Sequence, residues 1–155
     1  MEVVWTSVVA VVGTLLGSVI THGFQRVRDR RGELFARSEA LRQERMAAYS
    51  AFASAVEDYR RGQADRWYRK LEDPDGGTFF AARDETHRLR TVARQSLYRV
   101  KLLTDDAEVV LAAERAYWCT WDVSNARDQS DRDARDAQAR GAIESFVSGA
   151  SPLVR

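Results

Sequence analysis

Apolar residues recur at three- and four-residue steps along most of this chain, which is the spacing of one face of an α-helix. The pattern predicts a long helix over residues 33–73, a second over 78–103, a third from about 104 to 125 and a fourth over about 130–147. Turn-forming stretches follow the first and the last of them, EDPDGG at residues 72–77 and SGASP at 148–152. The pattern therefore predicts an all-α fold, either an antiparallel helical bundle or a set of helical hairpins.

The apolar positions also predict which face of each helix is buried. Helix by helix, the predicted inward residues are Leu34, Leu41, Ala48, Phe52, Ala55, Val56, Tyr59 and Trp67; Ala82, Leu89, Val92, Ser96, Val100 and Leu103; Val109, Ala112, Ala113, Ala116, Thr120 and Val123; and Ile143, Phe146 and Val147. We expect Thr104 or Asp105 to cap the third helix, since acidic residues occupy its first turn. Three acid-before-base pairs at four-residue spacing should stabilise the fourth helix: Asp128–Arg132, Asp131–Arg135 and Asp136–Arg140.

The N-terminal segment differs from the rest because no charged residue lies between Val3 and Thr21. A helix of about 19 residues spans roughly 29 Å, close to the hydrocarbon thickness of a bilayer. Glu2 precedes this segment and four arginines follow it, the reverse of a cleavable secretory signal. These arginines are Arg26, Arg28, Arg30 and Arg31. A buried core helix of a soluble domain is the alternative, but such a helix normally has a polar stripe, which is missing here.

The charge pattern predicts a topology and a set of domain boundaries. By the positive-inside rule, the arginines place the N-terminus outside the cell membrane and the main body in the cytoplasm. The predicted parts are a transmembrane anchor at residues 1–24, a basic juxtamembrane segment at 25–32, a helical cytoplasmic domain at 33–148 and a C-terminal tail at 149–155.

Small residues lie on one face of the predicted anchor. Gly13 and Gly17 are four residues apart in the sequence GTLLG, and Ala10 and Thr21 extend the same face. Small residues at this spacing let two helix backbones approach closely in lipid. We therefore expect these four residues to form a helix–helix association face.

The composition limits the chemistry that the chain can perform. Cys119 is the only cysteine, which excludes an internal disulfide and a Cys-pair zinc site. The two histidines, His22 and His87, have no partners at ligand spacing. No glycine-rich phosphate loop is present, and nothing marks a general acid and base. We therefore expect no catalytic residues, no metal and no cofactor, and we predict that the protein is not an enzyme.

Five basic residues share one face of the second predicted helix, with Tyr98 among them: Arg83, His87, Arg90, Arg94 and Lys101. Such a face can bind the phosphates of DNA or of anionic lipids. The other interpretation is that the basic face pairs with acidic residues of the same chain. Residues 78–103 hold six bases and two acids, whereas residues 104–125 hold one base and five acids. Two antiparallel helices of opposite charge complement each other, so we favour pairing within the protein over nucleic-acid binding.

Large aromatic residues are frequent for so small a body. They are Tyr59, Trp67, Tyr68, Tyr117, Trp118 and Trp121. Packing in the core or at helix junctions is the default prediction for such residues, and a groove for a protein partner is the alternative. Cys119 lies between two of the tryptophans, where we expect a buried, inert thiol.

The order of these features resembles a known family. The apolar sequence SVVAVVGTLLGSVIT, the arginine-rich exit and RQERMAAYSAFASAVEDYRRGQADRW at residues 42–67 resemble the KilB-type proteins of actinobacterial conjugative plasmids. The resemblance covers roughly Trp5–Trp67 and implies a small membrane protein linked to plasmid transfer and spread between mycelial compartments. It carries over no functional residues.

Together these features predict a single-pass membrane adaptor or assembly protein that acts through protein–protein contacts, plausibly in plasmid transfer. Its expected partners are the membrane, further copies of itself, and other membrane or transfer proteins. Two alternatives stay open. One is a membrane tether that binds DNA through the basic helix face, and the other is a soluble helical protein that oligomerises through its apolar N-terminal helix.

Overall fold

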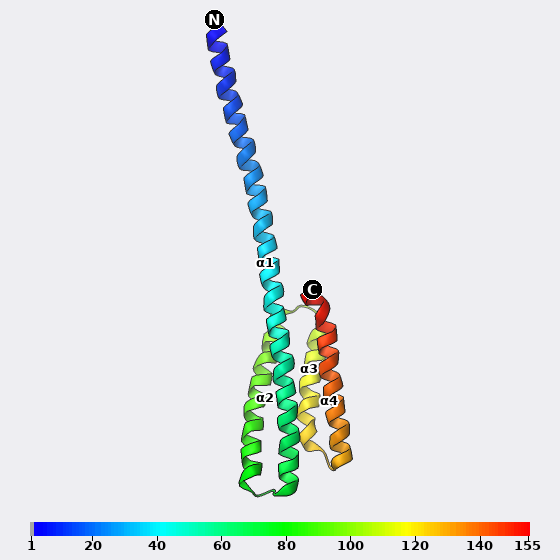
Figure 1. The fold of residues 1–155 in the computed structure, drawn as a ribbon. Helices are drawn as coiled ribbons and strands as arrows, with labels where there is room; N and C mark the ends of the chain where they lie inside the picture. The colour runs from blue at the N-terminus through cyan, green and yellow to red at the C-terminus, as the bar shows by residue number, and fades with distance from the viewer. Residues whose placement is uncertain (1) are drawn as a thin grey trace. The chain divides into compact units, whose positions relative to one another are not determined.

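The computed structural model describes the backbone from Glu2 to Arg155 and the side chains from Phe35 onward. Its helical elements, in chain order, are α1 (Glu2–Glu72), α2 (Gly77–Leu103), α3 (Ala107–Asp122), the 3₁₀ turn η1 (Val123–Asn125), α4 (Gln129–Ala150) and the 3₁₀ turn η2 (Ser151–Val154) (Figure 1). The chain divides into two compact units, Met1–Ala40 and Leu41–Arg155. The first unit contains the N-terminal part of α1, and the second contains everything that follows.

The second unit is a bundle of four helices, formed by the C-terminal part of α1 with α2, α3 and α4. Successive helices run in opposite directions, and the short turns that join them alternate between the two ends of the bundle (Figure 1). Residues 2–155 contain no strand. The prediction of an all-α fold with antiparallel packed helices is therefore confirmed.

The centre of the core lies between α1 and α4. Phe52, Val56 and Phe146 are fully buried, and the rings of Phe52 and Phe146 meet edge to face with centroids 4.9 Å apart. Tyr49 packs against Phe146 in the same manner at 5.9 Å. Edge-to-face pairs add about 0.5–1.5 kcal/mol to the stabilisation that burial of their area provides.

Gly62 brings α1 and α2 into close contact. A Cβ at this position would lie 2.6 Å from Leu89 Cδ1, so a larger residue would force the Leu89 side chain to shift. The hydroxyl of Thr86 donates a hydrogen bond to the Gly62 carbonyl at 3.1 Å, in addition to the one it donates to Ala82 within α2. A glycine normally weakens a helix interior, and here the close approach explains its presence.

Side-chain amide and indole groups attach α1 to the far end of the bundle. Gln63 is fully buried, and its Nε2 donates hydrogen bonds to the Trp121 carbonyl at 2.7 Å and to the Tyr59 hydroxyl at 3.2 Å. Trp67 Nε1 donates to the Ala126 carbonyl at 3.0 Å, just after η1. These contacts give the Gln63 amide nitrogen and the Trp67 indole nitrogen the partners that burial requires.

Most of the predicted inward residues with described side chains are buried, but three are exposed: Leu41, Val92 and Val147. The predicted inward residue Leu34 lies outside the described side chains. Leu41 was predicted wrongly because the bundle ends close to its level, where Arg42 and Arg45 donate hydrogen bonds to the carbonyls of Val154 and Leu103.

The inward face of α2 was predicted one position away from the observed one. Thr86, Ala93 and Leu97 are buried together with Val100, while Ala82, Leu89, Ser96 and Leu103 are only partly buried. The small side chains of Thr86 and Ala93 allow the close approach of α2, which a pattern based on large apolar residues does not reveal.

Two helix ends differ from the prediction. Asp106, not Thr104 or Asp105, caps α3 by accepting hydrogen bonds from the backbone N–H groups of Glu108 and Val109. The fourth helix also continues through SGA to Ala150 and leads directly into η2. Pro152 lies in the first turn of η2, where a residue without an N–H is tolerated.

We expect the substitution Phe146→Ala to lower the free energy of unfolding by about 3–5 kcal/mol, because it leaves a cavity between α1 and α4. Leu102→Ala is the matched control, since Leu102 is 85% exposed. It should change stability by less than about 0.5 kcal/mol. Denaturant unfolding of both full-length variants measures the difference, and equal effects would contradict the described core.

Candidate interaction surfaces

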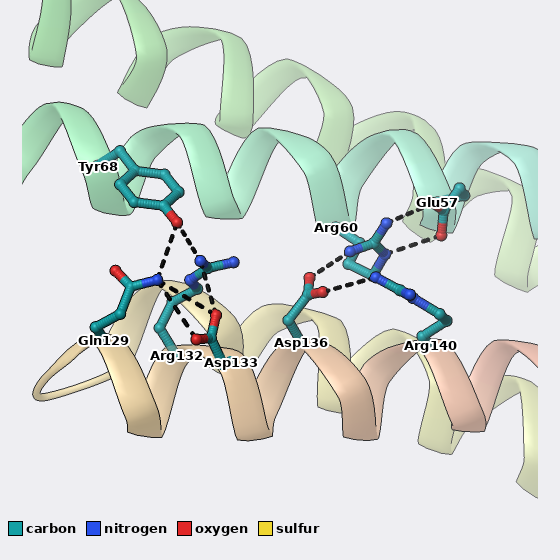
Figure 2. Close-up of polar contacts among 8 residues, drawn as sticks. All are labelled: Glu57, Arg60, Tyr68, Gln129, Arg132, Asp133, Asp136 and Arg140. Atoms are coloured by element: carbon teal, nitrogen blue, oxygen red, sulfur yellow. Dashed lines mark hydrogen bonds and ion pairs between the residues drawn. The ribbon is translucent and has the colours of Figure 1, made fainter.

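A buried ion pair connects α1 to α4. Arg60 and Asp136 are only 9% and 8% exposed, and Arg60 Nη1 donates a hydrogen bond to Asp136 Oδ1 (Figure 2). Glu57 accepts two further hydrogen bonds from Arg60, at 2.9 and 2.6 Å, and Arg140 donates to the second oxygen of Asp136 at 3.1 Å. The four side chains form a row of alternating charge in which each charge faces an opposite one.

The network changes the acidity of its members. The hydrogen bond from Arg60 holds the pKa of Glu57 below its usual range, and the same bond raises the pKa of Arg60. Glu57 and Arg60 therefore keep their charges at neutral pH. Because each charge has a partner, the network has no proton to offer and no unsatisfied ligand atom, and its role is to position the two helices.

A second polar group joins the end of α1 to the start of α4. Arg132 and Gln129 both donate hydrogen bonds to the hydroxyl of Tyr68, the latter at 3.1 Å (Figure 2). The Arg132 guanidinium also lies over the Tyr68 ring, 4.7 Å from its centroid, and pairs with Asp133 at 2.8 Å. These contacts hold the first turn of α4 against α1.

Two of the three predicted acid–base pairs on the fourth helix form: Asp131–Arg135 at 2.9 Å and Asp136–Arg140 at 3.1 Å. Asp128 does not pair with Arg132. Instead it caps α4 by accepting the backbone N–H of Asp131, which leaves Arg132 to contact Tyr68. A capping aspartate satisfies an otherwise unpaired helix donor, and this use of the side chain competes with a surface ion pair.

Sequence reasoning missed the buried polar residues Arg60, Gln63 and Asp136. A signal for two of them was present. Gln63 continues the inward series of Val56 and Tyr59, and Asp136 precedes the inward series of Ala139 and Ile143 by three residues. A polar residue at an inward helical position indicates a buried group that needs a hydrogen-bond partner.

The basic face predicted on α2 is partly used within the protein. Lys101 pairs with Glu114 of α3, and the Arg90 guanidinium lies 4.7 Å from the centroid of the Trp121 ring. A hydrogen bond with Tyr117 raises the pKa of Arg90. Both contacts join α2 to α3, in line with the internal pairing that the opposite charges of these helices favour.

The remaining members of the basic face stay at the surface of α2. Arg83 lies over the ring of Phe80 and 3.5 Å from Asp84, while His87 and Arg94 are exposed. The structure thus separates the five predicted residues into two that contact α3 and three that do not.

The aromatic residues divide into a buried and an exposed group. Tyr59, Trp67 and Tyr117 are buried in the bundle, as predicted for core packing. Trp118 and Trp121 are exposed on α3 with ring centroids 5.0 Å apart. Exposed tryptophans are enriched in protein interfaces, so this pair belongs to a candidate contact surface.

Cys119 lies between these tryptophans and is partly buried. Burial raises the pKa of its thiol, which keeps it protonated and unreactive at neutral pH. Among the residues with described side chains, no group of His, Cys, Asp or Glu could hold a metal ion. The prediction that the protein is not an enzyme stays a prediction.

The residues predicted for membrane topology and association lie outside the described side chains. They are Ala10, Gly13, Gly17 and Thr21 on the association face and Arg26, Arg28, Arg30 and Arg31 behind it. In the part of the chain whose side chains are described, no helix has the length and apolarity needed to cross a membrane.

The bundle and its surfaces define a class of protein: a small four-helix domain whose interior ion pairs are structural and whose exposed aromatic residues offer contact surfaces. The family model of the KilB plasmid transfer protein matches residues 46–154, which is most of the chain and nearly the whole bundle. The chain therefore belongs to the KilB plasmid transfer protein family, as its N-terminal half suggested. No curated protein and no solved structure matches it.

Removing one partner of the buried pair should destabilise the bundle. We expect Asp136→Ala to lower the free energy of unfolding by about 2–3 kcal/mol, less than a typical broken buried pair because Glu57 still neutralises Arg60. The double variant Arg60→Met with Asp136→Leu should lose less, because no unpaired charge remains in the interior. A double variant that is less stable than Asp136→Ala in denaturant unfolding would contradict this account.

Asp131 should make stability depend on pH. Hydrogen bonds from Arg135 and from the backbone of Arg127 lower its pKa from 3.8 to about 2. The folded state therefore gains stability from this carboxylate above pH 3.8 and loses it as the pH falls towards 2. Melting temperatures of the full chain between pH 5 and pH 2 should fall less steeply in Asp131→Asn, while Ser130→Ala on the same turn keeps the wild-type slope. Equal slopes in all three proteins would refute the assignment.

Proposed function

We propose that this protein is a membrane-anchored helical adaptor that serves plasmid transfer through protein–protein contacts. The match of the KilB family over residues 46–154 carries the proposal, because it supports a role in plasmid transfer for the bundle itself. The adaptor role is supported by the use of the buried charges, which bind one another and leave no reactive group.

The sequence supports the membrane anchor. Val3–Thr21 is uncharged and long enough to cross a bilayer as a helix, and four arginines follow it within ten residues. The proposed orientation places the N-terminus outside and the bundle in the cytoplasm. There the bundle meets the partners of the transfer process and the anchor keeps it at the membrane.

The exposed tryptophan pair on α3 supports binding of a protein partner. Trp118 is 52% exposed, whereas Tyr59, Trp67 and Tyr117 are buried in the same bundle. Beside it lies a groove of about 400 Å³, lined by Trp118, Trp121, Asp122 and Gln138 among others. Large aromatic residues next to a groove of mixed polarity are typical of the anchor points of protein interfaces.

A substitution within the proposed anchor tests localisation. The full chain should sediment with membranes and resist a carbonate wash, whereas Leu16→Arg should shift it to the soluble fraction, because a cation at the centre of a membrane helix opposes insertion by about 2.5–3.5 kcal/mol. Leu102→Arg is the matched control, since Leu102 lies on the surface of the bundle. If the wild-type chain is recovered in the soluble fraction as an oligomer without detergent, the membrane anchor is wrong and the alternative of a soluble helical assembly is supported.

The same variants test the role in transfer. Deleting the gene from a plasmid-bearing donor should lower the frequency of plasmid transfer or spread. The wild-type chain and Leu102→Arg should restore it, and Leu16→Arg should not. Full restoration by a Leu16→Arg chain that is found in the soluble fraction would show that the role does not need the anchor.

A DNA-binding tether predicts a different result. Its basis is the exposed pair of His87 and Arg94 on α2, with Arg90 beside them. Such a tether binds DNA with an affinity that falls steeply with salt, and the double variant Arg90→Ala with Arg94→Ala abolishes it. The adaptor predicts weak binding at low salt that this double variant leaves nearly unchanged.

A further inference from the structure

Two segments of the bundle carry no charge on any side. They are MAAYSAFASAV at residues 46–56 of α1 and SFVSGASPLV at residues 145–154 of α4 and η2. Charged residues make up 30% of the chain, so segments of this length ordinarily hold about three of them. These are the two longest uncharged runs among residues 35–155, and charges resume at once beyond them, at Arg45 and Glu57 and at Glu144 and Arg155.

The two segments lie side by side, since Phe146 of α4 packs against Tyr49 and Phe52 of α1. Between them runs an apolar groove of about 360 Å³. We call this surface the uncharged α1–α4 face. Its groove is lined by residues that include Met46, Ser50, Ala53, Val147, Ala150 and Ser151. Met46 and Val147 stand on its two sides and are each about half exposed.

The groove also contains an unsatisfied hydrogen-bonding group. Tyr49 lines it and is 95% buried, and its hydroxyl has no hydrogen-bond partner among the described residues. Buried polar groups without a partner are rare because each one weakens the folded state. The oxygen itself is enclosed by the protein, so a partner could reach it only if the side chains around it moved.

We propose that the uncharged α1–α4 face binds the same face of a second copy of this chain. The lack of charge on both segments is the ground for a second copy as the occupant. A face with charges of one sign repels its own copy, whereas an uncharged face meets itself without repulsion. A two-fold axis then brings each groove against the other, and every contact is made twice.

Small exposed residues on the two segments allow such an approach. Ala47, Ser50 and Ala51 are exposed on α1, and Ser148 and Gly149 are exposed on α4. Short side chains let the two helix pairs come close, so that Met46 and Val147 of one copy can enter the groove of the other.

This inference rests on the proposed function in one respect. An adaptor anchored by α1, with an association face at Gly13 and Gly17, would hold two bundles at high effective concentration, so that even a weak contact between them forms. The contact between the bundles is nevertheless a separate claim, and it can fail while the anchor and the adaptor role stand.

A charge placed on the face tests the proposal. Val147→Glu puts two carboxylates into the interface by symmetry and should weaken dimerisation of the full chain in detergent by about a hundredfold, since opposed like charges strongly disfavour association. Val92→Glu is the matched control, because Val92 is also an exposed helical valine, 40% against 48%, on a different helix. Analytical ultracentrifugation over a range of protein concentrations measures both, and melting curves check that both variants are folded.

Crosslinking locates the contact. With Cys119→Ala as background, a single cysteine at Ser50 should crosslink two copies through a short bismaleimide, whereas a cysteine at Thr91 on α2 should not. No crosslink at Ser50, together with a dimer that Val147→Glu leaves unchanged, overturns the proposal and leaves the groove to a different ligand.

The anchor helix provides the remaining comparison. If Gly13→Leu with Gly17→Leu abolishes the dimer and Val147→Glu has no effect, self-association runs through the anchor alone and the proposal is wrong. Val147→Glu should remain in the membrane fraction in every case. Its loss from that fraction would count against the proposed function instead, so the two failures are distinguishable.

Discussion

The position of α4 along α1 depends on one buried ion pair. Arg60 and Asp136 can meet in only one register, since a shift by one helical turn would leave each charge in the interior without its partner. An unpaired buried charge is far more costly than a misplaced apolar contact, so the pair discriminates between registers more sharply than Phe52 and Phe146 can. The apolar core holds the helices together, and the ion pair fixes the register in which α1 and α4 pack.

The same principle extends to the other helices. Most charged residues of the bundle are used in pairs within a helix or between neighbouring helices, such as Lys101 with Glu114. The opposite charges of α2 and α3 therefore help to hold these two helices together. The uncharged segments of α1 and α4, residues 46–56 and 145–154, are the exception to this pattern.

The helical architecture could be predicted from the sequence because it depends on local periodicity. The starts of α2 and α4 were placed within one residue of their observed positions, since glycine and aspartate mark them directly. The inward face of α2 could not be predicted in the same way. It depends on Gly62 of another helix, and a glycine within a helical pattern gives no sign of the neighbour that it admits.

The polar contacts were harder to predict than the apolar ones for a physical reason. An arginine or aspartate belongs to the surface unless a partner of opposite charge is brought against it, and that partner lies 76 positions away for Arg60. Only the arrangement of the helices reveals such a pair. The pairs that were predicted correctly, Asp131–Arg135 and Asp136–Arg140, are those whose members lie on one helical turn.

The contact between Phe52 and Phe146 has a consequence for how the protein is made. The ribosome completes the C-terminal part of α1 early, but the ring that covers it belongs to the last helix and is synthesised about 5–20 s later at a rate of about 5–20 residues per second. Through that interval the apolar side of α1 has only its neighbours α2 and α3 to cover it. The core of such a chain is completed only when its last helix is made. A chain truncated before α4 would leave Phe52 without the ring that covers it.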